Sequence, residues 1–269
     1  MAFITFNYFS SCLKRTVTAN AIIPADKTMT FGRFGKKKEF KTLYLLHGLL
    51  GDCNDWALNT PLRLLAESKD LAVILPSGEN GFYLNLPHPG MAYEDFVAKE
   101  LIEVTRRLFP LSRKREDTFI GGLSMGGYGA LRLGLKYHKT FSHILAFSSA
   151  VHVFEGQDNG NEFHSLFGDL KKAKHSDMNP RVCFLKMGKS LHGDASRYPH
   201  IYLSCARQDG LYEANVSFRD FLLEHQADVT WDEEDGGHNW DFWRSQIEKA
   251  IETLPLGESE QGIGSGNVK

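Results

Sequence analysis

The fold is decided by residues 118–133, which read TFIGGLSMGGYGALRL. The first four residues form a short apolar run typical of a buried strand, and the residues from Gly127 onward are typical of a helix. Between them, Gly122-Leu123-Ser124-Met125-Gly126 matches the pattern GxSxG. A strand, a tight turn and a helix around this pattern form a nucleophile elbow, in which a strained serine needs small neighbours. The segment therefore predicts an exposed Ser124 at the end of a strand, with a helix N-terminus behind it that favours negative charge.

Outward from this segment, short apolar runs alternate with helical patterns along most of the chain. The apolar runs lie at residues 42–46, 71–75, 118–121, 143–147 and 201–205. Their continuous hydrophobicity indicates strands that are buried on both faces. Their alternation with helices predicts an α/β fold with a mostly parallel central sheet and helices on both faces. Residues 3–9 and 15–23 alternate polar and apolar positions, which predicts an antiparallel N-terminal hairpin.

A single domain accounts for residues 1–256. Residues 150–199 interrupt the alternation, because they hold glycines, histidines and scattered aromatics without a clear buried strand. A segment of that length is too long for an ordinary connection and predicts a small cap insertion over the sheet. Residues 257–269 are polar and glycine-rich, so we expect a flexible tail. In the last helical pattern before this tail, Trp240 and Trp243 stand three residues apart and are expected to pack in the core.

A serine hydroxyl needs a base to take its proton, and His238 is the candidate. It lies in a glycine-rich loop between an apparent last strand at 227–231 and the last helix. An acid must hold such a base in one tautomer, and Asp209 lies just past the apolar run 201–206. Loops at the carboxyl ends of parallel strands are where α/β sites assemble, and the order Ser124, Asp209, His238 is that of α/β-hydrolases. The alternatives are a loop histidine and a surface aspartate without a catalytic role.

A site of this kind also needs donors for the oxyanion that forms at the substrate carbonyl. The loop after the apolar run 42–46 should contribute the N–H of Leu49. Met125 directly follows the nucleophile and should contribute the second N–H. Each such donor is worth about 3–4 kcal/mol of transition-state stabilisation. His47 lies in the same loop and is expected to shape it rather than to act as a base.

The composition of the 269 residues excludes several other classes of protein. A hydrophobic fraction of 42% excludes a mainly disordered chain, and a net charge of −2 gives no electrostatic basis for nucleic-acid binding. No apolar stretch approaches the roughly 18 residues of a membrane span, and the N-terminal residues lack the pattern of a secretory signal. The cysteines form no CxxC pair, so we expect reduced thiols in a cytoplasmic protein without a metal or cofactor. They are Cys12, Cys53, Cys183 and Cys205.

Together these segments resemble tributyrin esterases, which belong to the esterase D or S-formylglutathione hydrolase-like group of α/β-hydrolases. The resemblance is carried by LLHG at 45–48, GLSMGGYGA at 122–130, DGLYEAN at 209–215 and GHNWDFW at 237–243. It implies an α/β-hydrolase fold and a serine carboxylesterase that hydrolyses short-chain acyl esters through an acyl-enzyme intermediate. The resemblance also implies that Ser124 is the nucleophile, His238 the base and Asp209 the residue that orients the base.

Other reactions on the same three residues stay open at this point. They are hydrolysis of an S-formylglutathione-type thioester, hydrolysis of carbohydrate acetyl or feruloyl esters, and acyl transfer. A non-catalytic binding protein on this fold is the remaining alternative, although all three triad positions are filled. The expected partner is a small-molecule ester, with no nucleic acid and no membrane, and the resemblance is compatible with a homo-oligomer.

Overall fold

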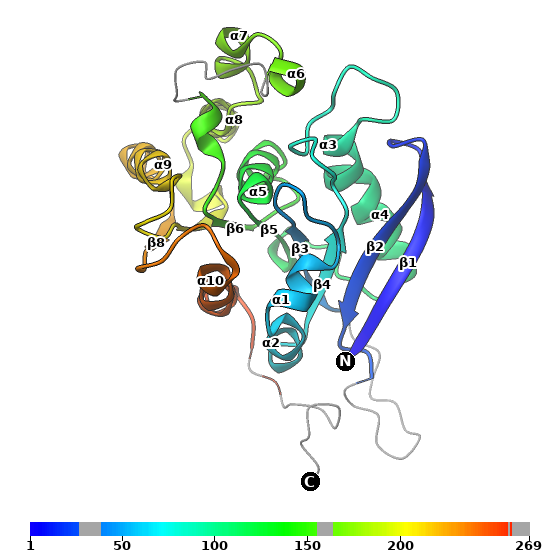
Figure 1. Cartoon of the computed structure of the whole chain (residues 1–269). Helices are drawn as coiled ribbons and strands as arrows, with labels where there is room; N and C mark the ends of the chain where they lie inside the picture. The colour runs from blue at the N-terminus through cyan, green and yellow to red at the C-terminus, as the bar shows by residue number, and fades with distance from the viewer. Residues whose placement is uncertain (27–38, 155–163, 258, 260–269) are drawn as a thin grey trace.

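A mixed eight-stranded sheet organises the computed structural model, which describes residues 1–26, 39–154, 164–257 and 259. The strand order is β1-β2-β4-β3-β5-β6-β7-β8 (Figure 1). The six strands from β3 to β8 run parallel to one another, as the continuous apolar runs predicted. The strands are β1 (Ala2–Ser10), β2 (Arg15–Ile23), β3 (Lys41–Leu46), β4 (Leu71–Pro76), β5 (Thr118–Leu123), β6 (His143–Phe147), β7 (His200–Ser204) and β8 (Val229–Asp232).

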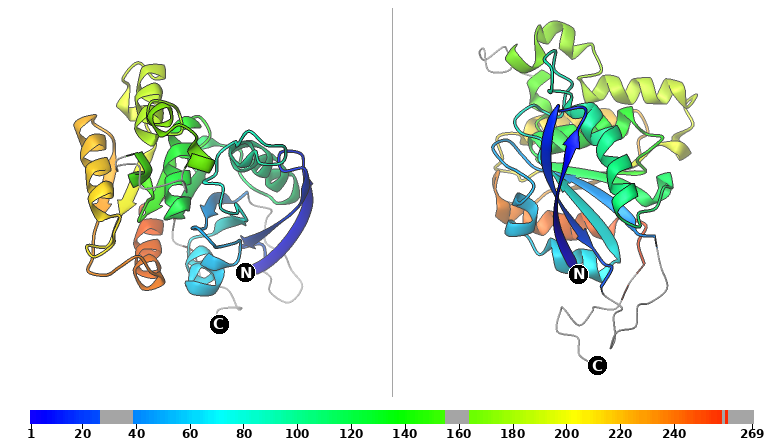
Figure 2. Two further views of the ribbon diagram at one scale, coloured as in Figure 1. Left: turned by 45° about the horizontal axis from the view of Figure 1, so that its top comes forward. Right: turned by 90° about the vertical axis from the view of Figure 1, so that its right-hand side faces the viewer.

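The predicted N-terminal hairpin is confirmed. Strands β1 and β2 pair in antiparallel register from Ala2 opposite Ile23 to Ser10 opposite Arg15. Half-buried and exposed side chains alternate along β1, because one face of the strand packs on the core and the other meets solvent. Strand β2 then pairs antiparallel with β4, which attaches the hairpin to the parallel part of the sheet. Figure 2 shows the hairpin, in blue, at the edge of the sheet.

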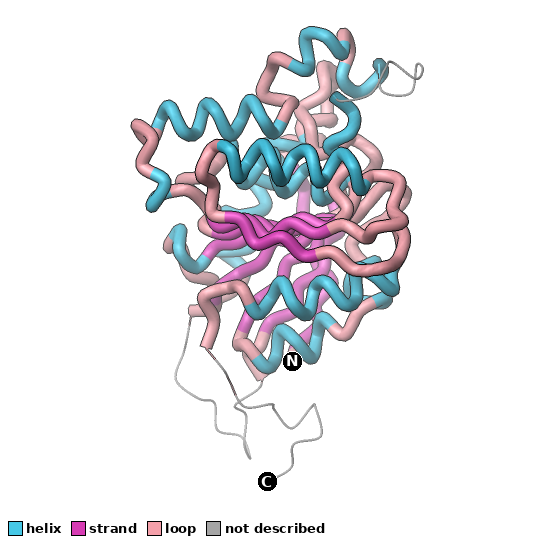
Figure 3. The backbone as a smooth tube through the Cα atoms, turned by 90° about the vertical axis from the view of Figure 1, so that its left-hand side faces the viewer, coloured by secondary structure: helices cyan, strands magenta, loops and turns pink. Residues whose placement is uncertain are grey.

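Helices cover both faces of the sheet, as Figure 3 shows with the strands in magenta between two layers of cyan. One face carries α1 (Asp55–Asn59), α2 (Leu62–Ser68) and α10 (Trp240–Glu252). The other carries α3 (Tyr93–Asp95), the π-helix η1 (Phe96–Glu100), α4 (Leu101–Leu108), α5 (Met125–Lys136), α8 (Pro180–Ser190) and α9 (Tyr212–Glu224). Short helices stand elsewhere: η2 (Arg115–Asp117), η3 (Val151–Phe154), α6 (His164–Phe167), α7 (Leu170–Lys174) and η4 (Ala195–Arg197). The architecture is that of an α/β-hydrolase.

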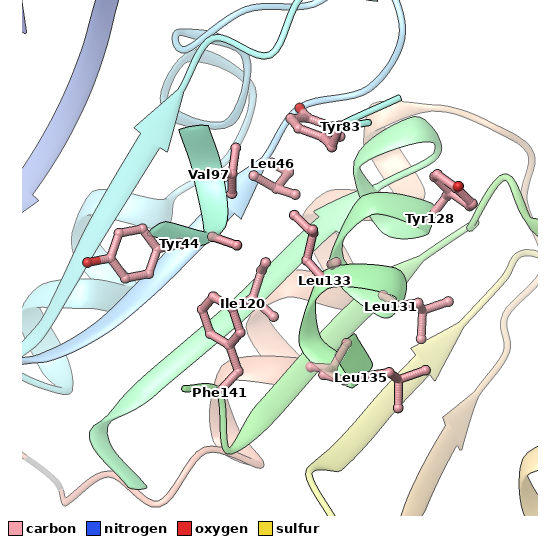
Figure 4. Packing of buried hydrophobic residues seen from close by; sticks show 14 of the residues in the cluster. Tyr44, Leu46, Tyr83, Val97, Ile120, Tyr128, Leu131, Leu133, Leu135 and Phe141 are labelled. Carbon is pink, nitrogen blue, oxygen red and sulfur yellow. The ribbon is translucent and has the colours of Figure 1, made fainter. Parts of the chain in front are cut away.

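Two hydrophobic clusters fill the spaces between the sheet and these layers. Every residue of β4 and β5 is buried, because both faces of these central strands are covered. Figure 4 shows part of the larger cluster, where Leu133 of α5 lies near Ile120 of β5. The packing holds α5 firmly against the strand that precedes it. None of the described helices is long and apolar enough to cross a bilayer.

The segment 150–199 connects the parallel strands β6 and β7. Its longest helix, α8, packs against α5 in the helical layer and is the crossover helix that a parallel pair requires. Helices α6 and α7 stand above that layer, at the top of Figure 1. Residues 155–163 of the predicted cap lie outside the described residues, and so does the predicted tail except for Gly257 and Ser259.

Candidate active site

Ser124 lies at a sharp turn between β5 and α5, as the GxSxG pattern predicted. Its φ of +54° is a strained conformation for a residue with a side chain. A Cβ on Gly122 would lie 2.4 Å from the Gly126 carbonyl oxygen, and a Cβ on Gly126 would lie 2.5 Å from the Leu46 and His47 carbonyl oxygens. Only glycine fits at both positions, so the two glycines let the strand, the turn and the neighbouring loop approach closely.

The structure brings Ser124, His238 and Asp209 into one hydrogen-bonded chain. His238 Nε2 lies 3.0 Å from Ser124 Oγ, and His238 Nδ1 lies 2.8 Å from Asp209 Oδ2. The three residues follow β5, β8 and β7, whose carboxyl ends meet at one edge of the sheet. The Asp209 side chain is 1% exposed and the His238 side chain 38% exposed, so the carboxylate is shielded from solvent while the imidazole is accessible.

The protonation states follow from the hydrogen bonds. Burial would raise the pKa of Asp209, but hydrogen bonds from His238, the Leu211 N–H and the Ser148 hydroxyl lower it below its usual value. Asp209 is therefore ionised at neutral pH and accepts only, which places the imidazole proton on Nδ1. His238 Nε2 then carries a lone pair and can accept the Ser124 proton.

The loop after β3 is held by His47, which shapes it as the sequence predicted. Its Nδ1–H donates to the Gly48 carbonyl at 2.7 Å, and its Nε2 accepts from the Gly78 N–H at 2.7 Å. The Tyr83 hydroxyl donates to the His47 carbonyl at 2.9 Å. Burial lowers the pKa of His47, so the ring is neutral and both of its nitrogens are engaged. A buried neutral ring of this kind fixes the loop.

This loop packs directly beside the serine. A Cβ on Gly48 would lie 3.5 Å from the Ser124 Cβ, and Leu49 is the next residue of this loop. Met125 is the first residue of α5, where helix N–H groups have no partner within the helix. Within the described part of the chain, neither the Leu49 nor the Met125 N–H donates a hydrogen bond. Both are therefore free to bind a ligand oxygen.

Comparisons with known proteins show which family the chain belongs to. The family model described as "Putative esterase" matches residues 10–254. The chain belongs to this esterase family. It is 42% identical to an acetyl esterase of Caldicellulosiruptor saccharolyticus, over 94% of this chain and 98% of the relative.

Solved structures of related serine hydrolases are similar over nearly the whole esterase. The fluorophosphonate-binding serine hydrolase FphF of Staphylococcus aureus is 28% identical, with a TM-score of 0.82 over 94% of this chain and 98% of its own. An S-formylglutathione hydrolase, FrmB, of the same organism is 29% identical, with a TM-score of 0.81 and the same coverage of both chains. The protein is therefore a serine esterase, a carboxylic ester hydrolase that acts on a small-molecule ester.

A cavity of about 560 Å³ adjoins the loop after β3 of this esterase. Leu50, Gly51, Glu79, Asn80, Gly81, Met91 and Leu166 line it. Glu79 is paired with Arg15, so its charge is compensated. Asn80 Oδ1 accepts from the Leu50 N–H at 2.8 Å and thereby holds the outer end of the loop. The other lining residues are apolar or neutral, so the lining carries a single charged side chain, that of Glu79.

Asn215 is a fully buried residue of the esterase that the sequence did not mark as part of the site. Its Oδ1 accepts from the Ser149 N–H at 3.0 Å. Its Nδ2 donates to the Ser149 and Leu211 carbonyls at 2.9 and 2.8 Å. It therefore ties the loop after β6 to the loop that carries Asp209. The only signal in the sequence was its place in the DGLYEAN segment, because Ser149, its partner in the other loop, lies 66 residues away.

The described residues of the esterase contain no group of three or more His, Cys, Asp or Glu side chains arranged to hold a metal ion. The acidic stretch after β8 is occupied by ion pairs. Asp232 pairs with Lys249, and Glu233 and Asp235 pair with Arg207. These carboxylates are thus part of the surface that supports α10 and the loop after β7.

Proposed function

We propose that Ser124 is the nucleophile of this serine esterase, His238 its general base and Asp209 the residue that orients the base. The N–H groups of Leu49 and Met125 form the oxyanion hole. The observation that carries this proposal is the hydrogen-bonded chain from Ser124 Oγ through His238 to Asp209, with distances of 3.0 and 2.8 Å. The expected roles follow from the chemistry that such a chain performs.

The reaction proceeds through an acyl-enzyme. Ser124 Oγ attacks the ester carbonyl carbon while its proton passes to His238 Nε2. The carbonyl oxygen becomes an oxyanion that accepts hydrogen bonds from the Leu49 and Met125 N–H groups. When the intermediate collapses, the carbon–oxygen bond to the alcohol breaks and His238 gives its proton to the leaving alcohol. Water, activated by the same histidine, then releases the acyl group as a carboxylic acid.

The substrate class that we propose is an uncharged ester with a short acyl chain. Two observations support it: the largely neutral cavity beside the loop after β3, and the 42% identity to an acetyl esterase over nearly the whole chain. The 29% identity to an S-formylglutathione hydrolase supports a second candidate, hydrolysis of a thioester. A panel of p-nitrophenyl esters from acetate to dodecanoate, with acetylated sugars, feruloyl esters and S-formylglutathione, separates the two. Activity that rises with acyl length would contradict the first candidate, and preference for the thioester would favour the second.

The decisive experiment on the roles is the Ser124→Ala variant. We expect it to lose turnover of p-nitrophenyl acetate and labelling by a fluorophosphonate probe, because the alanine has no oxygen that can attack carbon or phosphorus. The matched control is Ser217→Ala, which removes an exposed hydroxyl on α9 and should keep both activities. Retained turnover in Ser124→Ala would contradict the proposed nucleophile.

A cytoplasmic location and self-association stay predictions for this chain. The first rests on the few, widely spaced cysteines, and the second on the family resemblance. Fractionation of the producing cell tests the location. Light scattering coupled to size-exclusion chromatography tests the assembly, and a mass of 30.3 kDa would indicate a monomer.

A further inference from the structure

Among the described strands, β1 lies at one edge of the sheet and has a neighbour, β2, on one side only. In an antiparallel pair, every second residue directs its backbone N–H and C=O groups away from the partner strand. Within the described part of the chain, no hydrogen bond joins these outward-directed groups of β1 to another element. The right-hand view of Figure 2 shows the hairpin on the surface that faces the viewer. Strand β1 therefore presents an open row of backbone donors and acceptors that is about 30 Å long.

Natural edge strands are protected against pairing with other chains by charged residues, proline, bulges or short length. Strand β1 has none of these features. Its nine residues, AFITFNYFS, include no charged residue and no proline. Its register with β2 runs unbroken from Ala2 to Ser10, so no bulge interrupts the strand. The edge is therefore a template on which a further strand can pair.

The opposite edge of the sheet differs in these features. Strand β8 has four residues and ends at Asp232, and three further acidic residues follow at 233–235. A short strand beside a cluster of charges is protected against pairing. Of the two edges, the open one is β1, so we expect a pairing that joins β1 to β1 and not β1 to β8.

Two large apolar side chains lie on the solvent face of β1. Phe3 is 45% exposed and Phe9 66% exposed. Thr5 and Asn7 lie between them on the same face, because alternate residues of a strand point the same way. The residues of the other face, which packs on the core, are half-buried. A strand that pairs along this edge reduces the exposure of both phenyl rings.

The sequence of β1 is complementary to a second copy of itself. Antiparallel pairing with Phe6 opposite Phe6 places apolar residues opposite apolar ones and polar residues opposite polar ones. The opposed pairs are Phe3–Phe9, Ile4–Tyr8, Thr5–Asn7 and Phe6–Phe6. A shift by two residues would oppose Phe3 to Asn7 or Phe9 to Thr5, and a shift by one would oppose the solvent face to the core face. Aromatic pairs across strands stabilise a sheet, so this register favours a second copy of the chain as the partner.

We propose that β1 pairs with β1 of a second copy of this chain, so that one continuous sheet runs through a two-fold symmetric dimer. Such a pairing closes on itself, because both copies use the same surface. The inference assigns a surface to the self-association that the family resemblance suggests, and it is independent of the proposed triad.

The dimer leaves both candidate active sites open. Strand β1 runs in the same direction as β4, because both are antiparallel to β2. The carboxyl end of β1 therefore lies on the side of the sheet where the candidate site assembles. A two-fold axis perpendicular to β1 turns the partner's sheet the other way, so the two sites face opposite directions. We therefore expect the same kcat and KM per site in the dimer and in a monomeric variant.

The Phe9→Lys variant tests this surface, because a lysine on an edge strand opposes pairing. Light scattering coupled to size-exclusion chromatography measures the molar mass over a wide range of protein concentration. Wild type should have twice the chain mass of 30.3 kDa, and Phe9→Lys should have 30.3 kDa. The matched control is Leu58→Lys, which places the same charge on α1 at a leucine that is 81% exposed, and it should stay dimeric. Unchanged turnover of p-nitrophenyl acetate in both variants shows that they are folded.

Hydrogen exchange and cross-linking locate the pairing. The outward-directed amides of β1 should exchange slowly in the dimer and fast in the Phe9→Lys monomer. On oxidation, a mixture of Phe3→Cys and Phe9→Cys chains should form a disulfide between unlike chains, because these two positions lie opposite each other. Neither variant alone should form it, since position 3 is far from position 3 of the partner copy, and position 9 from position 9.

Several results would overturn the proposal. A wild-type mass of 30.3 kDa at every concentration would exclude the dimer. A Phe9→Lys variant that stays dimeric would place self-association on another surface. Protection of the β1 amides in a monomer would mean that another part of the chain covers the edge. Activity that survives Ser124→Ala would instead refute the proposed triad, so the two failures are distinguishable.

Discussion

Substitution of His47 measures how much the conformation of the loop after β3 depends on one buried ring. In His47→Phe, the aromatic contact with Tyr83 persists, because a phenyl ring has nearly the shape of imidazole. Both hydrogen bonds of the ring are lost, which leaves the Gly78 N–H without its partner, whereas the Gly48 carbonyl keeps the Gly51 N–H at 3.3 Å. An orphaned buried group costs about 1–3 kcal/mol and a lost hydrogen bond about 0.5–1.5 kcal/mol, so the free energy of unfolding should fall by about 1.5–4.5 kcal/mol. The free energy of unfolding of a native protein is about 5–15 kcal/mol, so this loss would be a large fraction of the total.

The same substitution should lower kcat in the molecules that remain folded. Gly48 precedes Leu49 directly, so a loosened loop displaces the proposed oxyanion donor, and complete loss of one such donor costs about 10²- to 10³-fold. Urea unfolding followed by circular dichroism gives the stability, and turnover of p-nitrophenyl acetate gives kcat. His88→Phe is the control, since this histidine is exposed. A stability loss below about 1 kcal/mol together with unchanged kcat would refute the reasoning.

Three further perturbations test the surroundings of the site. Gly122→Ala should abolish folded, active enzyme, because its Cβ would lie 2.4 Å from the Gly126 carbonyl oxygen. Gly210→Ala is the control and should keep activity, because a Cβ there meets open space. Esterase activity and soluble yield are measured for both variants. Glu94→Gln should cost about 3–5 kcal/mol in urea unfolding, because it leaves the buried guanidinium of Arg132 without its carboxylate. Burial lowers the pKa of His143 to about 4, and the neighbouring imidazole of His200 in β7 contributes to this shift. Its unfolded pKa is about 6.5, so the unfolded chain gains a proton first as the pH falls. Stability should therefore fall between pH 6.5 and 4, by at most about 1.4 kcal/mol per pH unit, and His143→Gln should flatten this dependence in urea midpoints measured against pH.

Much of the sheet could be predicted, because the central strands are buried on both faces and their sequences are continuously apolar. Strand β8 is the weakest case: the pattern indicated 227–231, and the structure has Val229–Asp232. All four residues of that strand are half-buried, so its sequence carries little hydrophobic signal. Helix α8 was not indicated at all, since it buries only a narrow stripe that includes Cys183 and Met187.

The sequence could predict the candidate site to the extent that its residues lie just after the ends of predicted strands. Glycine spacing and chain order pointed to Ser124, Asp209 and His238, and the structure brings these three together. The prediction that Trp243 packs in the core is confirmed, since its side chain is 6% exposed. Its second contact, with Ser148, depends on the meeting of β6 and α10, which are 95 residues apart at that point. No local pattern encodes such a meeting.

The position of β8 has a consequence for how the enzyme loses activity. This strand lies at the edge of the sheet, hydrogen-bonds only to β7 in the strand order, and leads into the loop that carries His238. Edge elements with little buried surface open locally at a lower free energy than the whole molecule unfolds. Such local opening removes the proposed base, His238, while Ser124 stays at the end of the buried strand β5. Mild denaturant should therefore abolish activity at a lower concentration than it unfolds the sheet. Loss of turnover then reports local opening at this edge of the sheet.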